Sequence, residues 1–496
     1  MAASATGTIL THKGYSIPKD VLTDAQTKEM IEDLTVCPKL NMKFATAAAK
    51  EDATFKIYRE SSSRWYLPRH YGVQKFGPAM SSVLSEGLDL PVAAAEFKGT
   101  PYPYQVDIVN SFLKAGANGL ICVPCGRGKT FMALRTAALI GKRFLVVVDK
   151  EFLMNQWKGE MTALMPGLRI GILQGPKREV DPANYDCTIC MIQSIAGKDL
   201  PESLFTSYGF AIFDECHHLG AQHFSKCLLK IQPKKMLGLS ATPKREDGLT
   251  KVFFWCLGEP VYWEKKREPD SSVVVKSVRI SIPIADDPEY NTVPTNWRGE
   301  PVMGRLLTNV LAARLRTAEI KRWICRLCEE PARKVLVLSE RIGHLEEIEK
   351  GLGGSGLTTA YYIGGMKEEK RELGAATARV LLASYAMASE AMNIKSLNAV
   401  ILASPRKAVE QSTGRILRIR PNERVVAPVI VDLVDSHGMY LSMWKKRAAY
   451  YRQCAYKIET VSMGVDDMPT PSGDSEEEIN AFEIRTADVN GCLLED

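Results

Sequence analysis

The feature that most constrains the fold is an alternation between short, largely β-branched apolar runs and longer segments of amphipathic, helix-like pattern. Five runs fall between residues 119 and 242: GLICVP, RFLVVVD, CTICMI, FAIFDE and MLGLSAT. Five more fall between residues 334 and 435: KVLVLS, TTAYYIG, ARVLLAS, NAVILAS and PVIVDLVD. Apolar strands that alternate with crossover helices are typical of a parallel sheet covered on both faces. The pattern therefore predicts an α/β protein with two tandem parallel-sheet domains.

Breaks in this alternation indicate the domain boundaries. Residues 1–90 lack it, and we treat them as an N-terminal accessory region of open role. We predict a first α/β domain at 91–265, a linker or insertion rich in proline and turn residues at 266–310, and a second α/β domain at 311–460. The acidic tail, 461–496, has the composition of a disordered segment.

Composition and charge narrow the class of protein. The chain has 496 residues, 45% of them hydrophobic and 25% charged, and it has no apolar stretch near the roughly 20 residues of a membrane-spanning helix. Its N-terminus lacks a secretory pattern, so we expect a soluble intracellular protein of the nucleus or cytoplasm. Residues 465–496 carry a net charge of −9, which leaves +15 on residues 1–464. A basic body is typical of nucleic-acid binders, although charge alone fits a solvated surface equally well.

The end of the first apolar run carries the pattern PCGRGKT. Its glycines allow backbone N–H groups to curl around phosphate oxygens, and the helix that follows adds the positive end of its dipole. Lys129 is expected to reach the β and γ phosphates, and Thr130 to bind Mg²⁺. The first glycine of the strict phosphate-loop motif is replaced by Val123. The predicted ATP-binding residues of this loop are Pro124, Cys125, Gly126, Arg127, Gly128, Lys129 and Thr130.

A second run ends in DECHH, where two carboxylates stand side by side. If PCGRGKT holds a nucleotide, Asp214 is placed to hold Mg²⁺ and Glu215 to orient or deprotonate the attacking water. The competing interpretation is a zinc site. Its candidate ligands are Cys216, His217, His218, His223 and Cys227, together with C-x-x-C pairs at Cys122 and Cys125, Cys187 and Cys190, and Cys325 and Cys328. Structural zinc sites need two close ligand pairs, and none of these pairs has a second one at that spacing.

The motifs PCGRGKT, DECHH, GLSATPKRED and QSTGRILR follow one another in an order and spacing that resemble the superfamily 2 helicase motor, and most closely its XPB-like branch. The resemblance covers roughly residues 97–450. The stretch RWYLPRHYGVQKFG also resembles a segment of DEAD/DEAH-type helicases of large DNA viruses. The resemblance implies an ATP-dependent helicase or translocase with two RecA-like domains, with ATP and Mg²⁺ in the cleft between them. It further implies 3′ to 5′ movement, DNA favoured over RNA as the partner, and a viral replication site as the location if the protein is viral.

The resemblance also implies individual roles. Phe97 and Gln105 are expected to read the adenine, and Gln411, Arg415 and Arg418 to close on the nucleotide. Arg415 and Arg418 lie at i and i+3, which predicts that they project toward the γ-phosphate from one helical face. The residues expected to grip the nucleic-acid backbone are Lys150, Ser194, Arg341 and Ser384. Those expected to couple hydrolysis to movement are His217, Ser240, Thr242, Arg245, Glu246 and Asp247, with His217 relaying between Asp214 and the Ser240 segment.

Two departures from the family pattern keep other functions open. Ala391 and Asn393 stand where the family commonly has glycine and aspartate, so the coupling between ATP and strand grip could be altered. One alternative is a nucleotide-gated nucleic-acid-binding adaptor, or a transcript-release factor, that does not separate strands. Another is a nuclease or restriction subunit that uses the same motor. A transcription or repair protein could bind through the N-terminal region or the acidic tail.

Overall fold

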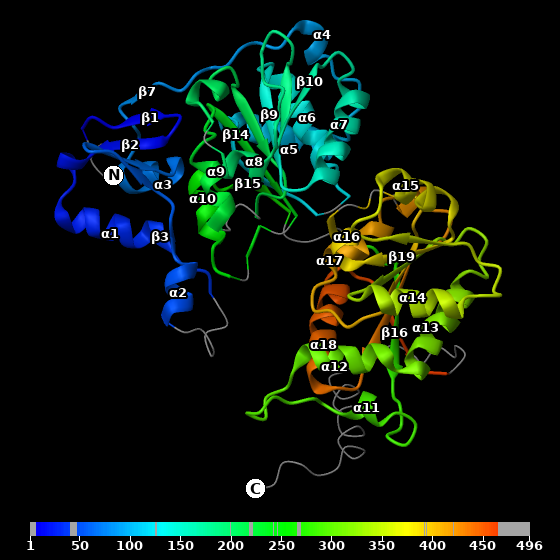
Figure 1. The fold of residues 1–496 in the computed structure, drawn as a ribbon. Coiled ribbons are helices and arrows are strands. Elements are labelled where there is room, and N and C mark those ends of the chain that lie inside the picture. Colours follow the sequence, from blue (N-terminus) through cyan, green and yellow to red (C-terminus); the bar gives the residue numbers. More distant parts are fainter. Residues whose placement is uncertain are drawn as a thin grey trace. The chain divides into compact units, whose positions relative to one another are not determined.

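The structure is a computed structural model that describes residues 6–39, 47–124, 126–198, 200–217, 222–241, 243–245, 247–264, 269–390, 392, 394–419 and 421–464. The chain divides into two compact units, Met1–Lys265 and Lys266–Asp496 (Figure 1). The predicted acidic tail, from residue 465 onward, lies outside the described residues.

The main sheet of the first unit has eight strands in the order β11-β10-β12-β9-β13-β14-β8-β15. Its neighbouring strands are parallel, except that β10 and β11 pair antiparallel. The strands are β8 (Asn118–Cys122), β9 (Phe144–Val148), β10 (Ile170–Gln174), β11 (Lys177–Arg178), β12 (Cys187–Met191), β13 (Phe210–Phe213), β14 (Lys235–Ser240) and β15 (Pro260–Trp263). The helices are α4 (Val92–Ala95), α5 (Pro103–Lys114), α6 (Lys129–Ile140), α7 (Glu151–Leu164), α8 (Ile192–Ala196), α9 (Gln222–Leu228) and α10 (Thr250–Leu257), with a 3₁₀ turn at Glu202–Phe205. Apolar clusters lie on both faces of this sheet, as the unbroken apolar runs predict.

The N-terminal region forms a smaller sheet within the first unit, in the order β5-β6-β2-β1-β7. Its strands are β1 (Ile9–Thr11), β2 (Gly14–Pro18), β5 (Arg59–Glu60), β6 (Arg64–Leu67) and β7 (Ser81–Ser82), with a separate pair β3 (Thr35–Val36) and β4 (Phe55–Lys56). Its helices are α1 (Asp24–Leu34), α2 (Ala47–Ala53) and α3 (Arg69–Phe76), with a 3₁₀ turn at Lys19–Val21. The core of this region includes Leu249 and Val252 at the start of α10, so the region packs against that helix of the first unit.

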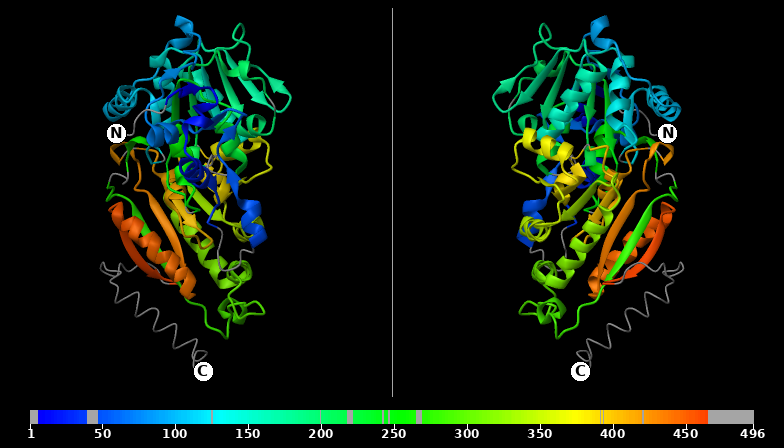
Figure 2. Two further views of the ribbon diagram at one scale, coloured as in Figure 1. Left: turned by 90° about the vertical axis from the view of Figure 1, so that its left-hand side faces the viewer. Right: turned by 90° about the vertical axis from the view of Figure 1, so that its right-hand side faces the viewer.

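The second unit contains a seven-stranded parallel sheet in the order β18-β19-β17-β20-β21-β16-β22. The strands are β16 (Val274–Ile280), β17 (Val335–Ser339), β18 (Thr359–Tyr362), β19 (Val380–Ser384), β20 (Ala399–Leu402), β21 (Val429–Asp435) and β22 (Lys457–Ser462). The helices are α11 (Pro288–Asn291), α12 (Met303–Ala312), α13 (Arg314–Leu327), α14 (Ile342–Gly351), α15 (Glu368–Thr377), α16 (Tyr385–Glu390), α17 (Glu410–Thr413) and α18 (Gly438–Gln453), with 3₁₀ turns at Gly414–Ile416 and Pro421–Glu423. Apolar clusters again cover both faces, and Figure 2 shows α18 lying along the sheet. The predicted α/β class with two parallel-sheet domains is confirmed.

The segment 266–310 differs from the linker or insertion that its turn residues predict. It contains β16, which pairs with β21 on one side and β22 on the other. Two charged residues interrupt the apolar run of this strand and hide it in the sequence. Lys276 forms an ion pair with Glu459 at 2.6 Å, and the Arg279 guanidinium lies 5.0 Å from the centre of the Trp444 ring.

No helix in the described part of the chain is both long enough and apolar enough to span a membrane.

Candidate active site

Three adjacent strands of the first unit bring the predicted motifs together. In the sheet, β14 lies between β13 and β8. The three strands are parallel, so their carboxyl ends lie at one edge. The carboxylate pair follows β13, Ser240 ends β14, and the phosphate loop follows β8. This edge is where ligands bind in open α/β sheets.

The phosphate loop has the backbone geometry that its glycines permit. Gly126 and Gly128 have φ angles of 89° and 78°, a region that L side chains rarely adopt. Gly128 is the N-cap of α6, so Lys129 opens that helix. Arg127 is held from two sides, because its Nε lies 3.0 Å from Glu264 Oε2 and its guanidinium lies 4.2 Å from the centre of the Tyr104 ring. These contacts fix the loop between α5 and the end of β15, although Cys125 itself lies outside the described residues.

The lysine of the loop meets the carboxylate pair. Lys129 Nζ lies 3.4 Å from Glu215 Oε1, and the two side chains are 12% and 21% exposed. Glu215 has a φ angle of 43°, which is unusual for a residue with a side chain and indicates a sharp turn directly after β13. The turn aims the carboxylate at the phosphate loop. A cation and an anion thus meet between the phosphate loop and the end of β13.

Asp214 is oriented by a residue that sequence reasoning did not single out. Trp157 on α7 donates from Nε1 to Asp214 Oδ2 at 2.8 Å, and the Glu215 backbone N–H donates to Oδ1 at 3.0 Å. Burial raises the pKa of Asp214 to about 6, with a further increase from the neighbouring Glu215 carboxylate and an opposing effect of Lys129. Two close, partly buried carboxylates form a site in which a cation is electrostatically favoured.

His217 lies between the end of β14 and the carboxylate pair. Its Nδ1 lies 3.1 Å from Ser240 Oγ, as expected, and 3.5 Å from Glu215 Oε2. Asp214 Oδ2 accepts a hydrogen bond from Trp157, and Glu215 follows it in the sharp turn after β13. The histidine therefore connects the β14 end to the second carboxylate of the pair.

The triplet at residues 245–247 is partly described. Arg245 donates from Nε to Asp247 Oδ1 at 2.9 Å and from Nη1 to the backbone carbonyl of His217. The triplet is therefore tied to the carboxylate segment through its arginine. Of the other predicted coupling residues, Thr242 and Glu246 lie outside the described residues.

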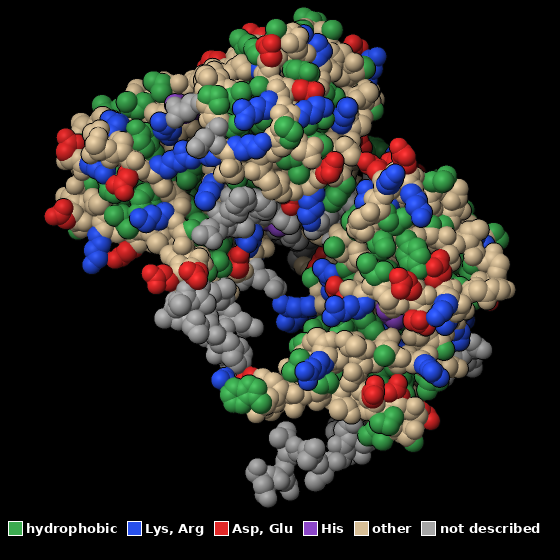
Figure 3. Space-filling model, in the orientation of Figure 1, with side chains coloured by type: hydrophobic (Ala, Val, Ile, Leu, Met, Phe, Trp, Pro, Cys, Tyr) green, Lys and Arg blue, Asp and Glu red, His purple; other side chains and the backbone are tan. Residues whose placement is uncertain are grey.

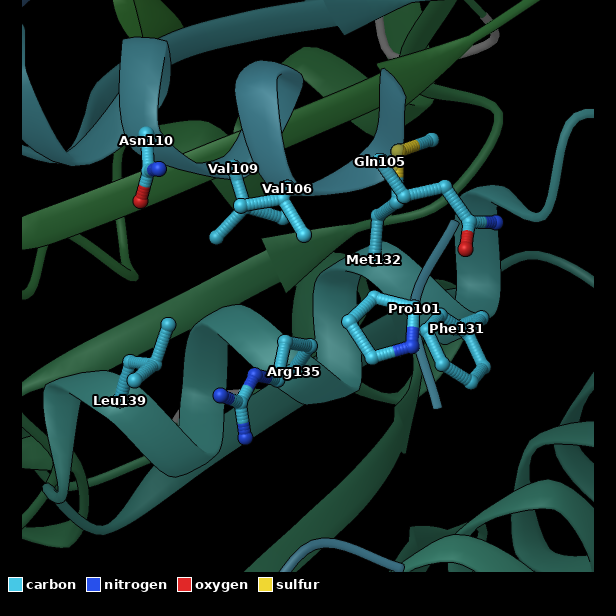
Figure 4. Close-up of a pocket in the computed structure, with 9 residues that line it drawn as sticks. All are labelled: Pro101, Gln105, Val106, Val109, Asn110, Phe131, Met132, Arg135 and Leu139. Carbon is cyan, nitrogen blue, oxygen red and sulfur yellow. The ribbon is translucent and has the colours of Figure 1, made fainter. Parts of the chain in front are cut away.

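The predicted adenine-reading residues lie on the α5 side of the phosphate loop. Gln105 is buried, and its Nε2 donates to the Arg127 carbonyl at 3.3 Å. Phe97 packs edge-on against Phe131 with ring centres 5.1 Å apart. A small cavity of about 140 Å³ lies beside them between α5 and α6, and Figure 4 shows its apolar side chains facing one another. Its lining residues are Pro101, Gln105, Val106, Val109, Asn110, Phe131, Met132, Arg135 and Leu139.

The cysteines and histidines of the zinc interpretation do not gather into a cluster in the part of the chain that the structure describes. Cys216 and Cys227 are buried in an apolar cluster, and burial raises the pKa of both thiols. His218 and the His223 side chain fall outside the described residues. Among the ten cysteines that are described, Cys37 and Cys325 are exposed and the others are buried.

The predicted strand-gripping residues all lie at or just beyond strand ends. Lys150 and Arg341 are the N-cap residues of α7 and α14. Ser194 is buried in α8, and its Oγ accepts a hydrogen bond from Gly175 N at 2.9 Å. Ser384 ends β19, and its Oγ accepts from Met387 N at 3.4 Å.

The closing motif of the second unit does not form the predicted helical face. Helix α17, which carries Gln411, ends at Thr413. Arg415 then lies in the 3₁₀ turn, and Arg418 follows it. Arg418 lies beyond the 3₁₀ turn, yet both arginines reach one acceptor. Arg415 Nη1 and Arg418 Nη2 donate to the Met392 carbonyl at 2.8 and 2.7 Å. The neighbours of that carbonyl, Ala391 and Asn393, lie outside the described residues.

Sequence reasoning missed the residues that support this site, namely Trp157, Tyr104 and Glu264. Trp157 ends the stretch VVVDKEFLMNQW, residues 146–157, where a lone tryptophan at helical spacing is indistinguishable from a core residue. Glu264 is 137 residues from its partner Arg127, and no local pattern connects the two. Only the fold, which places β15 next to β8, could reveal that contact.

A phosphate loop that faces paired carboxylates at the edge of a parallel sheet defines an ATP-hydrolysing motor of the RecA-like kind. Residues 98–245 match the family model described as the type III restriction enzyme, res subunit. The chain is 31% identical to a protein of Acanthamoeba polyphaga mimivirus named "Putative ATP-dependent RNA helicase", over 91% of this chain and 86% of that one.

Two further relatives extend this similarity. A "Putative ATP-dependent RNA helicase" of African swine fever virus is 27% identical over 67% of this chain and 68% of its own length. A "Putative DNA 3'-5' helicase" of Halobacterium salinarum is 34% identical over 32% of this chain and 26% of that one. The chain belongs to the superfamily 2 helicase family, in the group of ATP-dependent helicases that includes those of large DNA viruses and the XPB-like proteins.

Proposed function

We propose that this helicase uses Mg²⁺-dependent ATP hydrolysis to move 3′ to 5′ along DNA and separate its strands. The observation that carries the proposal is the contact between Lys129 and Glu215 at 3.4 Å, beside an Asp214 that Trp157 holds in place. A cation, a water-activating carboxylate and a metal-binding carboxylate are the groups that phosphoryl transfer to water requires.

The residues present fit Mg²⁺. Thr130 and Asp214 supply a hydroxyl and a carboxylate, and magnesium prefers such oxygen donors. Burial and the nearby Glu215 carboxylate raise the pKa of Asp214, so the ionised form of this carboxyl is disfavoured. A bound cation would stabilise the ionised form. When bound, Mg²⁺ neutralises charge on the β and γ phosphate oxygens.

Several side chains of the protein have separate roles in hydrolysis. Lys129 leaves its ion pair with Glu215 to bind the phosphates, which frees the Glu215 carboxylate to accept a proton from the attacking water. His217, placed against both Glu215 and Ser240, then links the state of that carboxylate to the end of β14. Arg415 and Arg418 of the second unit complete the charge stabilisation when the two units close on ATP.

The net charge of +15 on residues 1–464 supports binding to a phosphate backbone. In Figure 3, Lys and Arg side chains form a band across the visible face of the first unit. DNA is the proposed partner because the RED triplet resembles the XPB-like branch and because the Halobacterium relative is named a DNA helicase. RNA is the second candidate, since the mimivirus relative is named an RNA helicase.

The test is the ATPase rate of the full chain with Mg²⁺, measured alone and with single-stranded DNA, double-stranded DNA or RNA. Lys129→Ala should reduce hydrolysis to background because the phosphate-binding cation is lost. Glu215→Gln should retain bound ATP but hydrolyse it at least about 100-fold more slowly, as expected when a proton acceptor is removed. Lys114→Ala, at an exposed position of α5, is the matched control and should behave as wild type.

Two results would contradict the proposal. Wild-type turnover by either active-site variant would remove the residue assignment. Hydrolysis that responds to no nucleic acid, or a response without strand separation or translocation, would favour the nucleotide-gated adaptor instead.

A further inference from the structure

The second unit carries a projecting arm that the hydrolysis site does not use. The arm consists of residues 284–303, which follow β16 and end at the first residue of α12, and Figure 1 shows it extending away from the sheet. Four of its large apolar side chains are exposed. Ile284, Val293 and Met303 are 47%, 41% and 39% exposed, and Trp297 at the tip is 85% exposed. An exposed tryptophan loses the burial that normally stabilises it, so its position needs a reason.

The tip of the arm is a closed, hydrogen-bonded loop. Thr295 and Pro301 face each other across an antiparallel bridge. Inside it, Asn296 N donates to the Glu300 carbonyl at 2.8 Å, and Asn296 Oδ1 accepts from the backbone N–H of Glu300 at 3.0 Å. Gly299 has a φ angle of 76°, which allows the chain to reverse. The loop thus holds its two outermost side chains, Trp297 and Arg298, in a defined place.

The two side chains form a stacked pair. The Arg298 guanidinium lies over the Trp297 ring, 4.3 Å from its centre. The guanidinium covers one face of the indole and adds a positive charge, and the high exposure of the ring leaves the opposite face open. An open indole face beside a cation matches a nucleotide, because the base can stack on the ring while the guanidinium attracts the phosphate.

The base of the arm is fixed to the end of the sheet. Tyr290 is fully buried, and its hydroxyl donates to Asp435 Oδ1 at 3.1 Å. Arg316 binds the same carboxylate at 2.8 and 3.0 Å and donates to the Ala403 carbonyl at 2.6 Å. Since Asp435 ends β21, Tyr290 attaches the base of the arm to that strand. Arg316 of α13 connects the same carboxylate to Ala403, directly after β20.

The edge from which the arm leaves favours nucleic acid as its partner. The arm follows the carboxyl end of β16, and every strand of this sheet is parallel. The same edge carries Arg341 and Ser384, two of the residues proposed to grip the backbone. One nucleic-acid strand can therefore lie along this edge while one of its bases stacks on the indole at the tip.

We infer that Trp297 and Arg298 form a base-stacking site that holds a nucleobase at the junction between single-stranded and duplex nucleic acid. This inference rests on the proposed function, because a junction reaches the tip only if the chain engages nucleic acid. A base held on the indole cannot re-pair with its complement. The arm would thereby favour strand separation over re-annealing.

The test uses a forked DNA duplex with the fluorescent base 2-aminopurine placed in turn at positions around the junction. Without ATP, the full wild-type chain should quench the probe at one or two junction positions, because stacking on an indole quenches it. Trp297→Phe should retain most of the quenching, since a smaller ring still stacks. Trp297→Ala should abolish it and weaken binding to the fork about 10-fold, within the range expected for one base–aromatic stack. Val425→Ala, at a position 87% exposed in the same unit, should leave both measurements unchanged.

A second experiment measures strand separation, and the ATPase rate in the presence of single-stranded DNA, for the same variants. Trp297→Ala should slow strand separation about 10-fold and leave the ATPase within about twofold of wild type. Equal quenching by wild type and Trp297→Ala would overturn the inference and leave the tip for a protein partner. An equal loss of ATPase and strand separation would also overturn it. Failure of the proposed function gives a different result, because the wild-type chain would then lack any ATPase activity that nucleic acid stimulates. The quenching comparison is made without ATP, so it would still decide whether Trp297 stacks on a base.

Discussion

At the scale of the single residue, ionisation of the Asp214 carboxyl is unfavourable in the folded protein. This leads to a prediction about the free energy of unfolding. Its pKa is raised from 3.8 to about 6 by burial, with a contribution from Glu215. The folded state therefore holds the proton more tightly than the unfolded state. Ionisation of this group lowers the free energy of unfolding as the pH rises from about 4 through 6, and the cost is fully present at pH 7.

Asp214→Asn should accordingly stabilise the protein at pH 7 in the absence of Mg²⁺ and nucleotide, by about 1 to 2 kcal/mol after allowance for partial exposure. The gain should shrink as the pH falls below about 6 and be nearly lost by about pH 3, where the wild-type carboxyl is protonated in both states. Urea unfolding across this pH range measures the difference, and ATP hydrolysis should be lost in the variant. Asp107→Asn, on the exposed face of α5, is the control. A gain that persists at about pH 3 would rule out the electrostatic explanation.

Single residues also show how far the site could be predicted. Local spacing encodes a phosphate loop and a strand-end carboxylate pair, so it predicts that Lys129 lies close to Asp214 and Glu215, and the structure brings Lys129 Nζ within 3.4 Å of Glu215 Oε1. Trp157 and Glu264 were not predicted, because their contacts with Asp214 and Arg127 depend on which strands and helices become neighbours. A pattern in the sequence indicates the groups that do chemistry more readily than the groups that hold them in place.

At the scale of the element, the segment that follows α17 brings Arg415 and Arg418 to one shared acceptor. Arg415 is mostly buried, yet Arg418 donates to the same Met392 carbonyl at 2.7 Å. The carbonyl therefore keeps a donor when Arg415 is removed, so the fold should tolerate the change.

Arg415→Ala should leave ADP affinity and nucleic-acid binding within about threefold of wild type and lower kcat by at least about 1,000-fold, as loss of an arginine finger does. Steady-state kinetics and equilibrium binding measure the two effects separately. Lys350→Ala, at an exposed position of α14, is the control. Normal turnover by Arg415→Ala would show that this arginine does not contact the γ-phosphate.

Elements were predicted well where their pattern was unbroken. The ten apolar runs correspond to β8, β9, β12, β13 and β14 in the first unit and to β17, β18, β19, β20 and β21 in the second. β16 was missed because Lys276 and Arg279 interrupt it, and both charges are satisfied by partners outside the strand. The helical face expected for RILR was wrong because the helix ends earlier, at Thr413.

At the scale of the whole chain, one buried arginine ties the N-terminal region to the motor. Arg69 on α3 donates to the backbone carbonyls of Pro233 and Lys234 at 2.7 and 3.1 Å, directly before β14, and to Asn118 Oδ1 at 3.2 Å. Burial lowers its pKa to about 10, so the guanidinium remains charged at neutral pH.

Arg69→Ala should destabilise the first unit by about 2 to 4 kcal/mol, because it removes the hydrogen bond to the buried Pro233 carbonyl and opens a cavity. Limited proteolysis should then cleave within residues 1–90 faster than in wild type, and thermal unfolding should begin earlier. Lys28→Ala, at an exposed position of α1, should change neither. Unchanged proteolysis of Arg69→Ala would mean that the apolar contact with α10 holds the region without this arginine.

Because most of the described thiols are buried, dyes can be attached selectively to the exposed ones to follow movement of the two units. Of the described cysteines, the two exposed ones, Cys37 and Cys325, fall in different units, and the buried ones resist reagents that need a thiolate. Once Cys125 and Cys492, which lie outside the described residues, are replaced by serine, maleimide dyes should attach at one native position in each unit. Energy transfer between the dyes would then report, molecule by molecule and in real time, whether ATP brings the units together and whether its hydrolysis separates them.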